Sequence, residues 1–429
     1  MKPGTRISFS FKGQVLKGVV LNVEAGKLVL KLDSGYNISA APEELEAVKE
    51  LQTEPKEKTR REQRTPNPSL PRIALLHTGG TIASRVDYST GAVIAQYTAD
   101  EVLDLYPELH AIANIDSKLL ANMQSEMMRF AHWNIIAKAV EAAVKGGADG
   151  VIVTHGTDIL AMTSAALAFA LENLPVPVLL VGSQRSSDRP SSDAVTNLLC
   201  AAAFIAKEHA SFKGVALCMH EGVRNDDCFI LPACRTRKMH SSRRDAFKAI
   251  NDRPYARIAY PGLAVEKLKN YPPSPKVGLV MKPFNEQLKI GLLHVHPQFF
   301  AEELTAYEGF DGLVVEVLGL GHMPTMKTDE HNAEHESVLG ELVRLAQMMP
   351  VVAALQTIYG RIDMDVYSPG RQLVAAGVLG NGLDMIPETA FVKLAWLLSH
   401  HSIEETKKLY GESLRGELSP RSQEDGFRE

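Results

Sequence analysis

Two short stretches, residues 76–82 (LHTGGTI) and residues 153–158 (VTHGTD), decide the fold that this sequence predicts. Each begins at the end of a run of aliphatic residues typical of a buried strand, and glycine and threonine then interrupt that run. Open α/β folds bind their ligands at the carboxyl ends of parallel strands. The two stretches therefore predict a parallel sheet with threonine hydroxyls along this edge.

Similar apolar runs recur along the chain, between stretches with helical periodicity. This alternation predicts βαβ units, in which a mostly parallel sheet has helices on both faces. The pattern restarts after residue 270, so a second, smaller α/β domain is expected. The expected strands are 73–76, 151–153, 178–181, 215–217, 277–280, 312–317 and 351–355, and the expected helices include 132–144, 159–174, 334–347 and 388–399.

The first seventy residues have a different pattern. Residues 5–48 alternate between polar and apolar side chains, with glycine-containing turns between the runs, which predicts a small antiparallel barrel-like domain of four or five strands. Residues 49–70 are charged and then proline-rich, as is typical of a solvated linker, although an RNA-binding arm is an alternative. The predicted order is an all-β domain at 1–50, a linker at 51–70, a larger α/β domain with the threonines at 71–270 and a smaller α/β domain at 271–429.

Composition limits the classes of function. The chain has 429 residues, of which 45% are hydrophobic, and a net charge of −5, so it is an ordinary globular chain and is not coated with basic charge for nucleic acid. Its four cysteines form no C-x-x-C pair, so reduced thiols are expected. The sequence has neither an apolar stretch of about eighteen residues nor a signal-peptide core. We therefore expect a cytoplasmic protein that does not enter a membrane.

The threonines have both a structural and a catalytic interpretation. Thr81 and Thr157 have the residue type that caps helices, and Asp158 is favourable near a helix amino terminus. Catalysis is favoured because both turns occur in one domain, where two hydroxyls and a carboxylate can converge on one small substrate. A threonine hydroxyl needs a nearby base, commonly a lysine, and adjacent glycines let backbone N–H groups stabilise an oxyanion by about 3 kcal/mol per donor. These parts fit acyl transfer.

Five segments together resemble the bacterial-type L-asparaginase and glutaminase family: residues 78–82, 155–158, 181–185, 192–198 and 382–388. The resemblance implies a larger amino-terminal and a smaller carboxyl-terminal α/β domain, and hydrolysis of a side-chain amide through a threonine acyl-enzyme. By position, it implies that Thr81 is the nucleophile and that Lys238 is the lysine that partners the second threonine, Thr157. Asp158 corresponds to the acidic residue that holds the substrate's α-ammonium group by charge-assisted hydrogen bonding.

Two further site residues follow from the same resemblance. The family has a tyrosine on a mobile lid after its first threonine, and Tyr88 corresponds to it. The family's serine for the substrate carboxylate lies in the region of residues 123–127, where either Gln124 or Ser125 corresponds to it.

Three other motifs have ordinary interpretations that are favoured over functional ones. One is a cluster of basic residues around Lys238, for which a solvated loop is favoured over an RNA contact. The other two are pairs of histidines with the spacing of metal ligands. An ordinary strand is favoured for the first pair and a solvated helix start for the second, so no metal site is predicted. The cluster is Arg235, Arg237, Lys238, Arg243 and Arg244, and the pairs are His294 with His296 and His331 with His335.

The amino-terminal seventy residues make the chain similar to one branch of this family, the D subunits of archaeal glutamyl-tRNA(Gln) amidotransferases. Residues 87–93, 319–322 and 360–367 carry the same similarity. It implies that the chain hydrolyses glutamine and supplies ammonia to a partner E subunit, as a homodimer within a heterotetramer. The partner would bind ATP and Mg²⁺ and most of Glu-tRNA(Gln), and this chain would bind no cofactor, consistent with its lack of a phosphate-binding Gly-rich loop with lysine.

Two alternatives remain open at this point. One is a free-standing cytoplasmic L-asparaginase with an accessory amino-terminal domain. The other is a binding scaffold whose asparaginase-like site is inactive.

Overall fold

The structure of the chain is a computed structural model that describes residues 2, 4–24, 26–33, 37–51, 66–80, 84–86, 93–95, 107–185, 192–224 and 227–421. Within these ranges no helix is both long enough and apolar enough to cross a membrane.

The amino-terminal residues form a five-stranded antiparallel sheet with the strand order β4-β3-β2-β1-β5. Its hydrophobic core follows the alternation of the sequence, since Ile7, Phe9, Leu28 and Leu30 are buried while their neighbours are not. The expected small antiparallel unit is therefore confirmed. The strands are β1 (Arg6–Phe11), β2 (Gln14–Glu24), β3 (Lys27–Leu32), β4 (Asn37–Ala40) and β5 (Glu46–Glu50).

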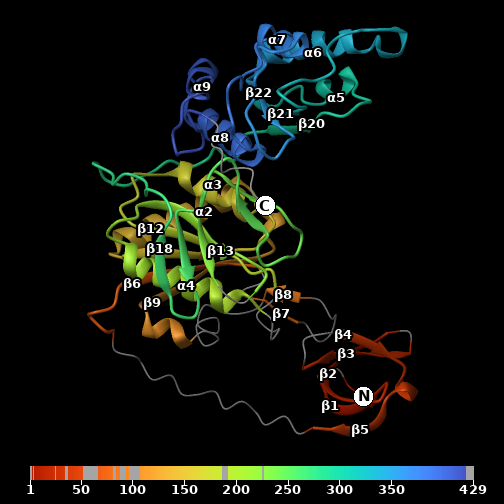
Figure 1. Cartoon of the computed structure of the whole chain (residues 1–429), viewed down its shortest axis with the longest axis vertical. Helices are drawn as coiled ribbons and strands as arrows, with labels where there is room; N and C mark the ends of the chain where they lie inside the picture. The colour runs from red at the N-terminus through yellow and green to blue at the C-terminus, as the bar shows by residue number, and fades with distance from the viewer. Residues whose placement is uncertain are drawn as a thin grey trace.

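The central sheet, which lies in the middle of Figure 1, has eight strands. Their order is β18-β17-β14-β13-β12-β10-β6-β9. From β9 to β13 the neighbouring strands are parallel, and from β13 to β18 they are antiparallel. The parallel part is β9 (Asn114–Met123), β6 (Arg72–Gly79), β10 (Gly150–Thr154), β12 (Pro177–Val181) and β13 (Gly214–His220). The antiparallel part is β14 (Cys228–Pro232), β17 (Ala256–Ala259) and β18 (Ala264–Lys267).

The parallel strands have a topological switch point between β6 and β10. The chain moves from β6 outward to β9, then crosses back over β6 to β10 and continues to β12 and β13. Open sheets with this winding bind ligands in the crevice at the carboxyl ends of the two strands at the switch point. These are the two strands that end in residues 76–80 and 153–158.

Helices cover both faces of the central sheet. α2 (Phe130–Lys145) and α3 (Leu160–Ala170) pack on one face, and α4 (Ala194–Glu208) packs on the other. Successive residues of β6 point to opposite faces, so Leu76 packs in the core beside α2 and α3, and Leu75 in the core beside α4. The mostly parallel sheet predicted from the apolar runs is confirmed.

The helix predicted at residues 159–174 is too long. α3 ends at Ala170 because the next two residues form β11 (Leu171–Glu172), which pairs antiparallel with β19 (Val280–Met281). Asn173 then has a φ of 60°, in the left-handed region, so the chain turns away. The strand predicted at 277–280 is correspondingly short and shifted to β19.

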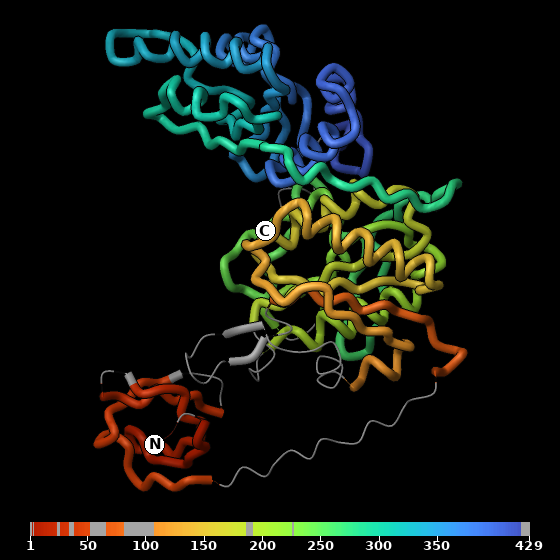
Figure 2. Tube along the Cα trace, turned by 180° about the vertical axis from the view of Figure 1, so that it is seen from behind, coloured from red at the N-terminus to blue at the C-terminus, as the bar shows by residue number. Residues whose placement is uncertain are grey.

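The second α/β unit is a three-stranded parallel sheet, β20-β21-β22. Helix α8 (Pro387–His400) lies between this sheet and the central unit, because its residues share one hydrophobic core with α3 and with the inner face of the small sheet (Figures 1 and 2). Trp396 of α8 packs on Phe169 of α3 with ring centroids 5.7 Å apart. The other elements are β20 (Ile290–His294), β21 (Gly312–Val317), β22 (Val351–Leu355), α5 (Ala301–Thr305), α6 (His335–Met348), α7 (Ser368–Ala375) and α9 (Ile403–Leu409).

Two short hairpins and four 3-10 turns complete the described secondary structure. One hairpin, β15 and β16, carries Lys238. The elements are β7 (Ser84–Val86), β8 (Val93–Ala95), β15 (Thr236–Lys238) and β16 (Phe247–Ala249), with 3-10 turns at Pro42–Glu44, Pro107–Ala111, Ser125–Met127 and Glu330–Asn332.

Candidate active site

The two sequence stretches that predicted the fold are in direct backbone contact. β6 and β10 are neighbours, with His77 opposite Thr154, so the turns after them meet at the switch point. A Cβ atom on Gly80, which has a φ of 76°, would lie 2.5 Å from the backbone nitrogen of Gly156. Glycine is required at position 80 both by this contact and by the left-handed backbone. The turn after β6 also contacts the end of β9, where the carbonyl oxygen of Met123 accepts a hydrogen bond from the Gly80 N–H at 3.2 Å.

Buried polar side chains fix the ends of β6 and β10 from behind. Thr78 donates from Oγ1 to the carbonyl oxygen of Thr154 at 2.9 Å, and His77 Nδ1 lies 2.8 Å from Thr154 Oγ1. His155 is fully buried, with Nδ1 2.6 Å from the carbonyl oxygen of Gly156. Burial lowers the pKa of His77 and of His155 to about 4. Both histidines are therefore neutral near pH 7 and serve the architecture of the turns.

These two histidines predict that the fold loses stability in mild acid. In the unfolded chain a histidine is protonated below about pH 6.5, whereas in the folded protein both histidines stay neutral down to about pH 4. Between these pH values the unfolded state therefore binds more protons than the folded state. We expect the free energy of unfolding to fall by about 1 kcal/mol for each histidine between about pH 7 and about pH 5.5. Urea denaturation at the two pH values measures this, and the variant His155→Asn should show a smaller fall. An equal fall in the variant and in the original chain would contradict the assignment.

Thr157, Asp158 and Lys238 form a hydrogen-bonded cluster beside these turns. Lys238 Nζ donates to Thr157 Oγ1 at 2.9 Å and to Asp158 Oδ1 at 2.8 Å. The lysine side chain is 16% exposed, whereas that of Asp158 is 63% exposed, so the carboxylate remains open to a ligand. Neither Thr157 nor Asp158 caps α3, because the N-cap position is Ile159 and no side chain bonds there. The capping interpretation of this turn is therefore wrong.

The turn after β12 packs against the methyl group of Thr157. A Cβ atom on Gly182 would lie 2.9 Å from Thr157 Cγ2, so glycine permits this approach. Asp193 holds the turn by accepting hydrogen bonds from the Ser183 hydroxyl at 2.8 Å and from the Gln184 backbone N–H at 3.0 Å. The turns after three neighbouring strands, β6, β10 and β12, thus meet at one place.

The basic cluster of the sequence is divided among separate ion pairs. Arg235 is 3% exposed and pairs with Asp384, Arg237 pairs with Glu388, and Arg243 pairs with Asp245. Of these pairs, the first two join the segment before Lys238 to the second α/β unit. Sequence reasoning did not find Asp384 and Glu388 as part of the site, although both lie in the stretch 382–388 that carried the family resemblance.

Ser125 and Gln124 lie at the end of β9 but differ in burial. Ser125 is 2% exposed, and a Cβ atom on Gly156 would lie 2.9 Å from its Oγ. Among the described residues this hydroxyl has no hydrogen-bond partner, and Gln124 is exposed. Ser125 therefore has a hydroxyl without a described partner beside Gly156, in the stretch 153–158. Thr81 and Tyr88 lie outside the described residues.

The histidines with ligand-like spacing are used in ordinary pairs. His294 Nδ1 lies 2.7 Å from Glu316, and His296 Nε2 lies 2.9 Å from Glu303. His331 is in a 3-10 turn and His335 begins α6, so these two do not share one helix. The part of the chain that the structure describes contains no group of three potential metal ligands. All four cysteines are buried and free, as the sequence predicted.

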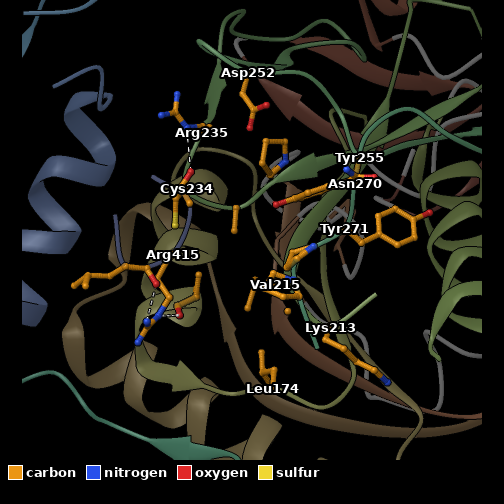
Figure 3. A pocket seen from close by; sticks show the side chains of 18 of the residues that line it. Leu174, Lys213, Val215, Cys234, Arg235, Asp252, Tyr255, Asn270, Tyr271 and Arg415 are labelled. Carbon is orange, nitrogen blue, oxygen red and sulfur yellow. Dashed lines mark hydrogen bonds between the residues drawn. The ribbon is translucent and has the colours of Figure 1, made fainter. Parts of the chain in front are cut away.

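A cavity of about 770 Å³, shown in Figure 3, has none of Thr157, Asp158 and Lys238 in its lining. It is lined by Lys213 and Val215 at the amino end of β13, by Asn270 and Tyr271 and by the carboxyl-terminal Arg415. Because β13 starts here, the cavity opens at the opposite edge of the sheet from the three turns. It is separate from the candidate active site.

Comparison with known proteins agrees with this geometry. Residues 72–270 match the family described as "Asparaginase, N-terminal", and residues 289–410 match "Glutaminase/Asparaginase C-terminal domain". Proteins named as the D subunit of glutamyl-tRNA(Gln) amidotransferase are similar over nearly the whole chain. That of Archaeoglobus fulgidus is 40% identical, with 98% of this chain and 96% of the relative aligned, and that of Pyrococcus furiosus is 40% identical, with 94% and 90% aligned.

Solved asparaginases share the two α/β units. The thermostable L-asparaginase from Thermococcus kodakarensis is 30% identical with a TM-score of 0.71, and the match covers 82% of this chain and 100% of that enzyme. L-asparaginase I from Vibrio cholerae is 27% identical with a TM-score of 0.68, covering 82% and 99%. From the sequence matches and the fold together, the chain belongs to the asparaginase and glutaminase family, and within it to the branch formed by the D subunits of glutamyl-tRNA(Gln) amidotransferases.

Proposed function

We propose that this chain hydrolyses the side-chain amide of glutamine and supplies the ammonia to an amidotransferase partner. The observation that carries the proposal is the contact of Lys238 with Thr157 and Asp158 at the switch point, 2.9 and 2.8 Å away, directly beside the turn that leads into Thr81. An amine, a hydroxyl and a carboxylate at the carboxyl ends of parallel strands are the groups that a threonine-dependent acyl transfer uses.

In the proposed mechanism Thr81 Oγ attacks the amide carbonyl carbon, and its proton passes by way of Thr157 and Lys238 to the amide nitrogen. Backbone N–H groups of the glycine-containing turns stabilise the oxyanion that forms. The C–N bond then breaks, the nitrogen departs as ammonia with the proton that came from Thr81, and the acyl group remains on Thr81. Water, positioned by Thr157 and Lys238, attacks the ester, which releases glutamate and restores the Thr81 hydroxyl.

Substrate binding is assigned to the charged and polar groups around this position. Asp158 is assigned as the partner of the substrate's α-ammonium group, because its side chain is exposed to a ligand while Lys238 holds one carboxylate oxygen. Ser125 is favoured over Gln124 for the substrate carboxylate, since the serine hydroxyl is unused and lies against Gly156. Tyr88 is proposed as the lid residue on the resemblance to the family.

The partner assignment rests on the amino-terminal sheet. The asparaginase from Thermococcus kodakarensis is matched along its full length by 82% of this chain, whereas the amidotransferase subunits align with 94–98% of it. We therefore favour an amidotransferase complex over a free-standing asparaginase. In this proposal the chain works in the cytoplasm with an E subunit, which binds ATP, Mg²⁺ and most of Glu-tRNA(Gln).

An exposed apolar surface supports assembly as a homodimer within a heterotetramer. It lies near the carboxyl ends of β21 and β22 in the second α/β unit. The loops that carry its side chains lie side by side, since the Asp363 N–H donates to the carbonyl oxygen of Leu320 and the rings of His322 and Tyr367 are 5.1 Å apart. Contiguous apolar surface on a monomer usually marks an interaction site. The residues are Leu318, Leu320, Ile358, Val366 and Tyr367, and the last is 57% exposed.

The proposed function is tested by measuring ammonia release from glutamine and from asparagine, first with the chain alone and then with an E subunit and Glu-tRNA(Gln). We expect glutamine hydrolysis that rises when partner and charged tRNA are present, and a loss of about 10³-fold or more in Thr81→Ala. Strong asparagine hydrolysis that ignores partner and tRNA would support the free-standing enzyme instead. Hydrolysis that is equal in Thr81→Ala and in the unmodified chain would reject the proposed chemistry.

A further inference from the structure

The segment that carries Lys238 is attached to a single stretch of the second α/β unit. Residues 233–238 leave β14, form a turn and end in the β15 strand, while residues 384–389 lead into α8. These two segments are about 150 residues apart in sequence and contact each other at three successive points.

The first two contacts hold the turn before Lys238. Arg235 donates to both carboxylate oxygens of Asp384, at 3.0 and 3.3 Å, and the two side chains are only 3% and 1% exposed. Thr389 donates from its hydroxyl to the carbonyl oxygen of Cys234 at 2.8 Å. A bidentate arginine–carboxylate pair fixes both distance and orientation, so this turn is held rigidly.

The third contact lies next to Lys238 itself. Arg237 Nε is 3.1 Å from Glu388 Oε1, and Glu388 is in the first turn of α8. Side chains of successive strand residues point to opposite faces, so Arg237 points away from the cluster that Lys238 enters. Glu388 therefore acts on Lys238 through the backbone and does not touch the reacting atoms.

Glu388 is committed to this one partner. Its Oε2 atom has no hydrogen-bond partner among the described residues. Burial raises the pKa of Glu388, and the Arg237 guanidinium opposes that shift. The side chain of Glu388 is only partly buried, and Arg237 is its ionic partner, so the pair is expected to contribute more than a fully exposed ion pair would.

The same helix also supports the other half of the cluster. α8 packs on α3 through Trp396 and Phe169, and Thr157 and Asp158 lie immediately before α3. Ser164 of α3 also donates to the carbonyl oxygen of Ala233 at 2.9 Å. α8 therefore contacts both the segment before Lys238 and the helix that follows Thr157 and Asp158, and Ser164 joins these two parts directly.

We propose that Glu388 is a positioning residue that, through Arg237, places Lys238 within hydrogen-bonding distance of Thr157 and Asp158. Asp384 assists by holding Arg235 in the turn before Lys238. The inference rests on the proposed function, since it takes Lys238 as part of an amide-hydrolysing site. It assigns to the second α/β unit a part in catalysis within the same chain: a shift of α8 would move the amine out of register with the hydroxyl.

The test compares Glu388→Gln with Glu388→Asp and with the matched control Glu172→Gln. Glu172 also pairs with cations, Lys282 at 3.0 Å and Arg415 at 2.6 Å, but it lies on β11, at the far end of α3 from Asp158. Glu388 is chosen over Asp384 because its side chain is 24% exposed, so the variant has a better prospect of folding.

For Glu388→Gln we expect kcat for glutamine to fall roughly 10- to 100-fold with KM within about twofold, since the loss affects an interaction of the reacting groups. Glu388→Asp should recover part of kcat, and Glu172→Gln should keep it.

A second readout follows the lysine directly. The rate at which a lysine-acylating reagent modifies Lys238, measured by peptide mass spectrometry, should rise in Glu388→Gln because the amine is released from Thr157 and Asp158. Unchanged kcat and unchanged Lys238 reactivity in Glu388→Gln would overturn the positioning role, as would equal losses in Glu388→Gln and Glu172→Gln. If Lys238→Met keeps full activity, the role of Lys238 in the proposed function fails instead, which separates the two failures.

Discussion

Lys238→Met is expected to lower kcat for glutamine hydrolysis by about 10³-fold or more while the chain stays folded. The reason is that Lys238 Nζ is the donor to both Thr157 Oγ1 and Asp158 Oδ1, at 2.9 and 2.8 Å. Methionine keeps the length and the apolar stem of lysine but removes the amine. Both partners then lose their common donor, so proton movement at the threonine and the orientation of the carboxylate are lost together.

A matched control lies on the paired strand. Lys248 on β16 is also in an ion pair, 3.6 Å from Asp245, and donates to the carbonyl oxygen of Glu221 at 3.1 Å. Lys248→Met removes a lysine from the same hairpin without touching Thr157 or Asp158. We expect its steady-state kinetics to stay within about twofold of the unmodified chain. Equal kinetics for Lys238→Met and Lys248→Met would show that the amine of Lys238 has no part in the reaction.

Glu417→Ala is expected to destabilise the fold by about 3–5 kcal/mol. Glu417 and Lys393 of α8 form an ion pair at 2.6 Å in which both side chains are 0% exposed. Glu417 also accepts hydrogen bonds from the backbone N–H groups of Leu414 and Arg415, at 3.0 and 2.6 Å. Removal of the carboxylate leaves a buried ammonium group without its counter-ion and two N–H groups without their acceptor.

The free energy of unfolding, from urea denaturation, measures this effect. Glu404→Ala is the control, because Glu404 pairs with Lys407 at 3.7 Å but is 79% exposed, and exposed pairs contribute about 1 kcal/mol or less. The double variant Lys393→Met with Glu417→Leu should recover much of the lost stability, since it removes both charges. If Glu417→Ala costs no more than Glu404→Ala, the carboxyl-terminal segment does not hold the fold as the buried pair indicates.

The sheets were predictable because their strands have strong local patterns. A continuous apolar run, such as that of β10, indicates a strand buried on both faces. Strict alternation of apolar and polar residues, such as that of β1, indicates a strand buried on one face only. The contact between the turns after β6 and β10 was also predictable, since the carboxyl ends of neighbouring parallel strands lie at the same edge of the sheet.

Other features depend on contacts between distant residues and leave no local pattern. The end of α3 at Ala170 is determined by the pairing of β11 with β19, more than a hundred residues later. The pairs of Arg235 with Asp384 and of Arg237 with Glu388 likewise join distant segments, so a cluster of basic residues in sequence became several ion pairs. Among the site residues, glycine and threonine patterns alone also permitted helix caps, and the separate roles of Thr81, Thr157, Asp158 and Lys238 came from the family resemblance.

The most direct test of the central claim follows the amide nitrogen from glutamine to tRNA. The chain, an E subunit, ATP, Mg²⁺ and Glu-tRNA(Gln) are incubated with glutamine labelled with ¹⁵N in its side-chain amide, in the presence of excess unlabelled ammonium. We expect the side-chain amide of the Gln-tRNA(Gln) product to contain mainly ¹⁵N, and Lys238→Met to abolish this label while free ammonium still supports amidation. Product that carries only unlabelled nitrogen with the unmodified chain would contradict the claim that this site makes ammonia for its partner.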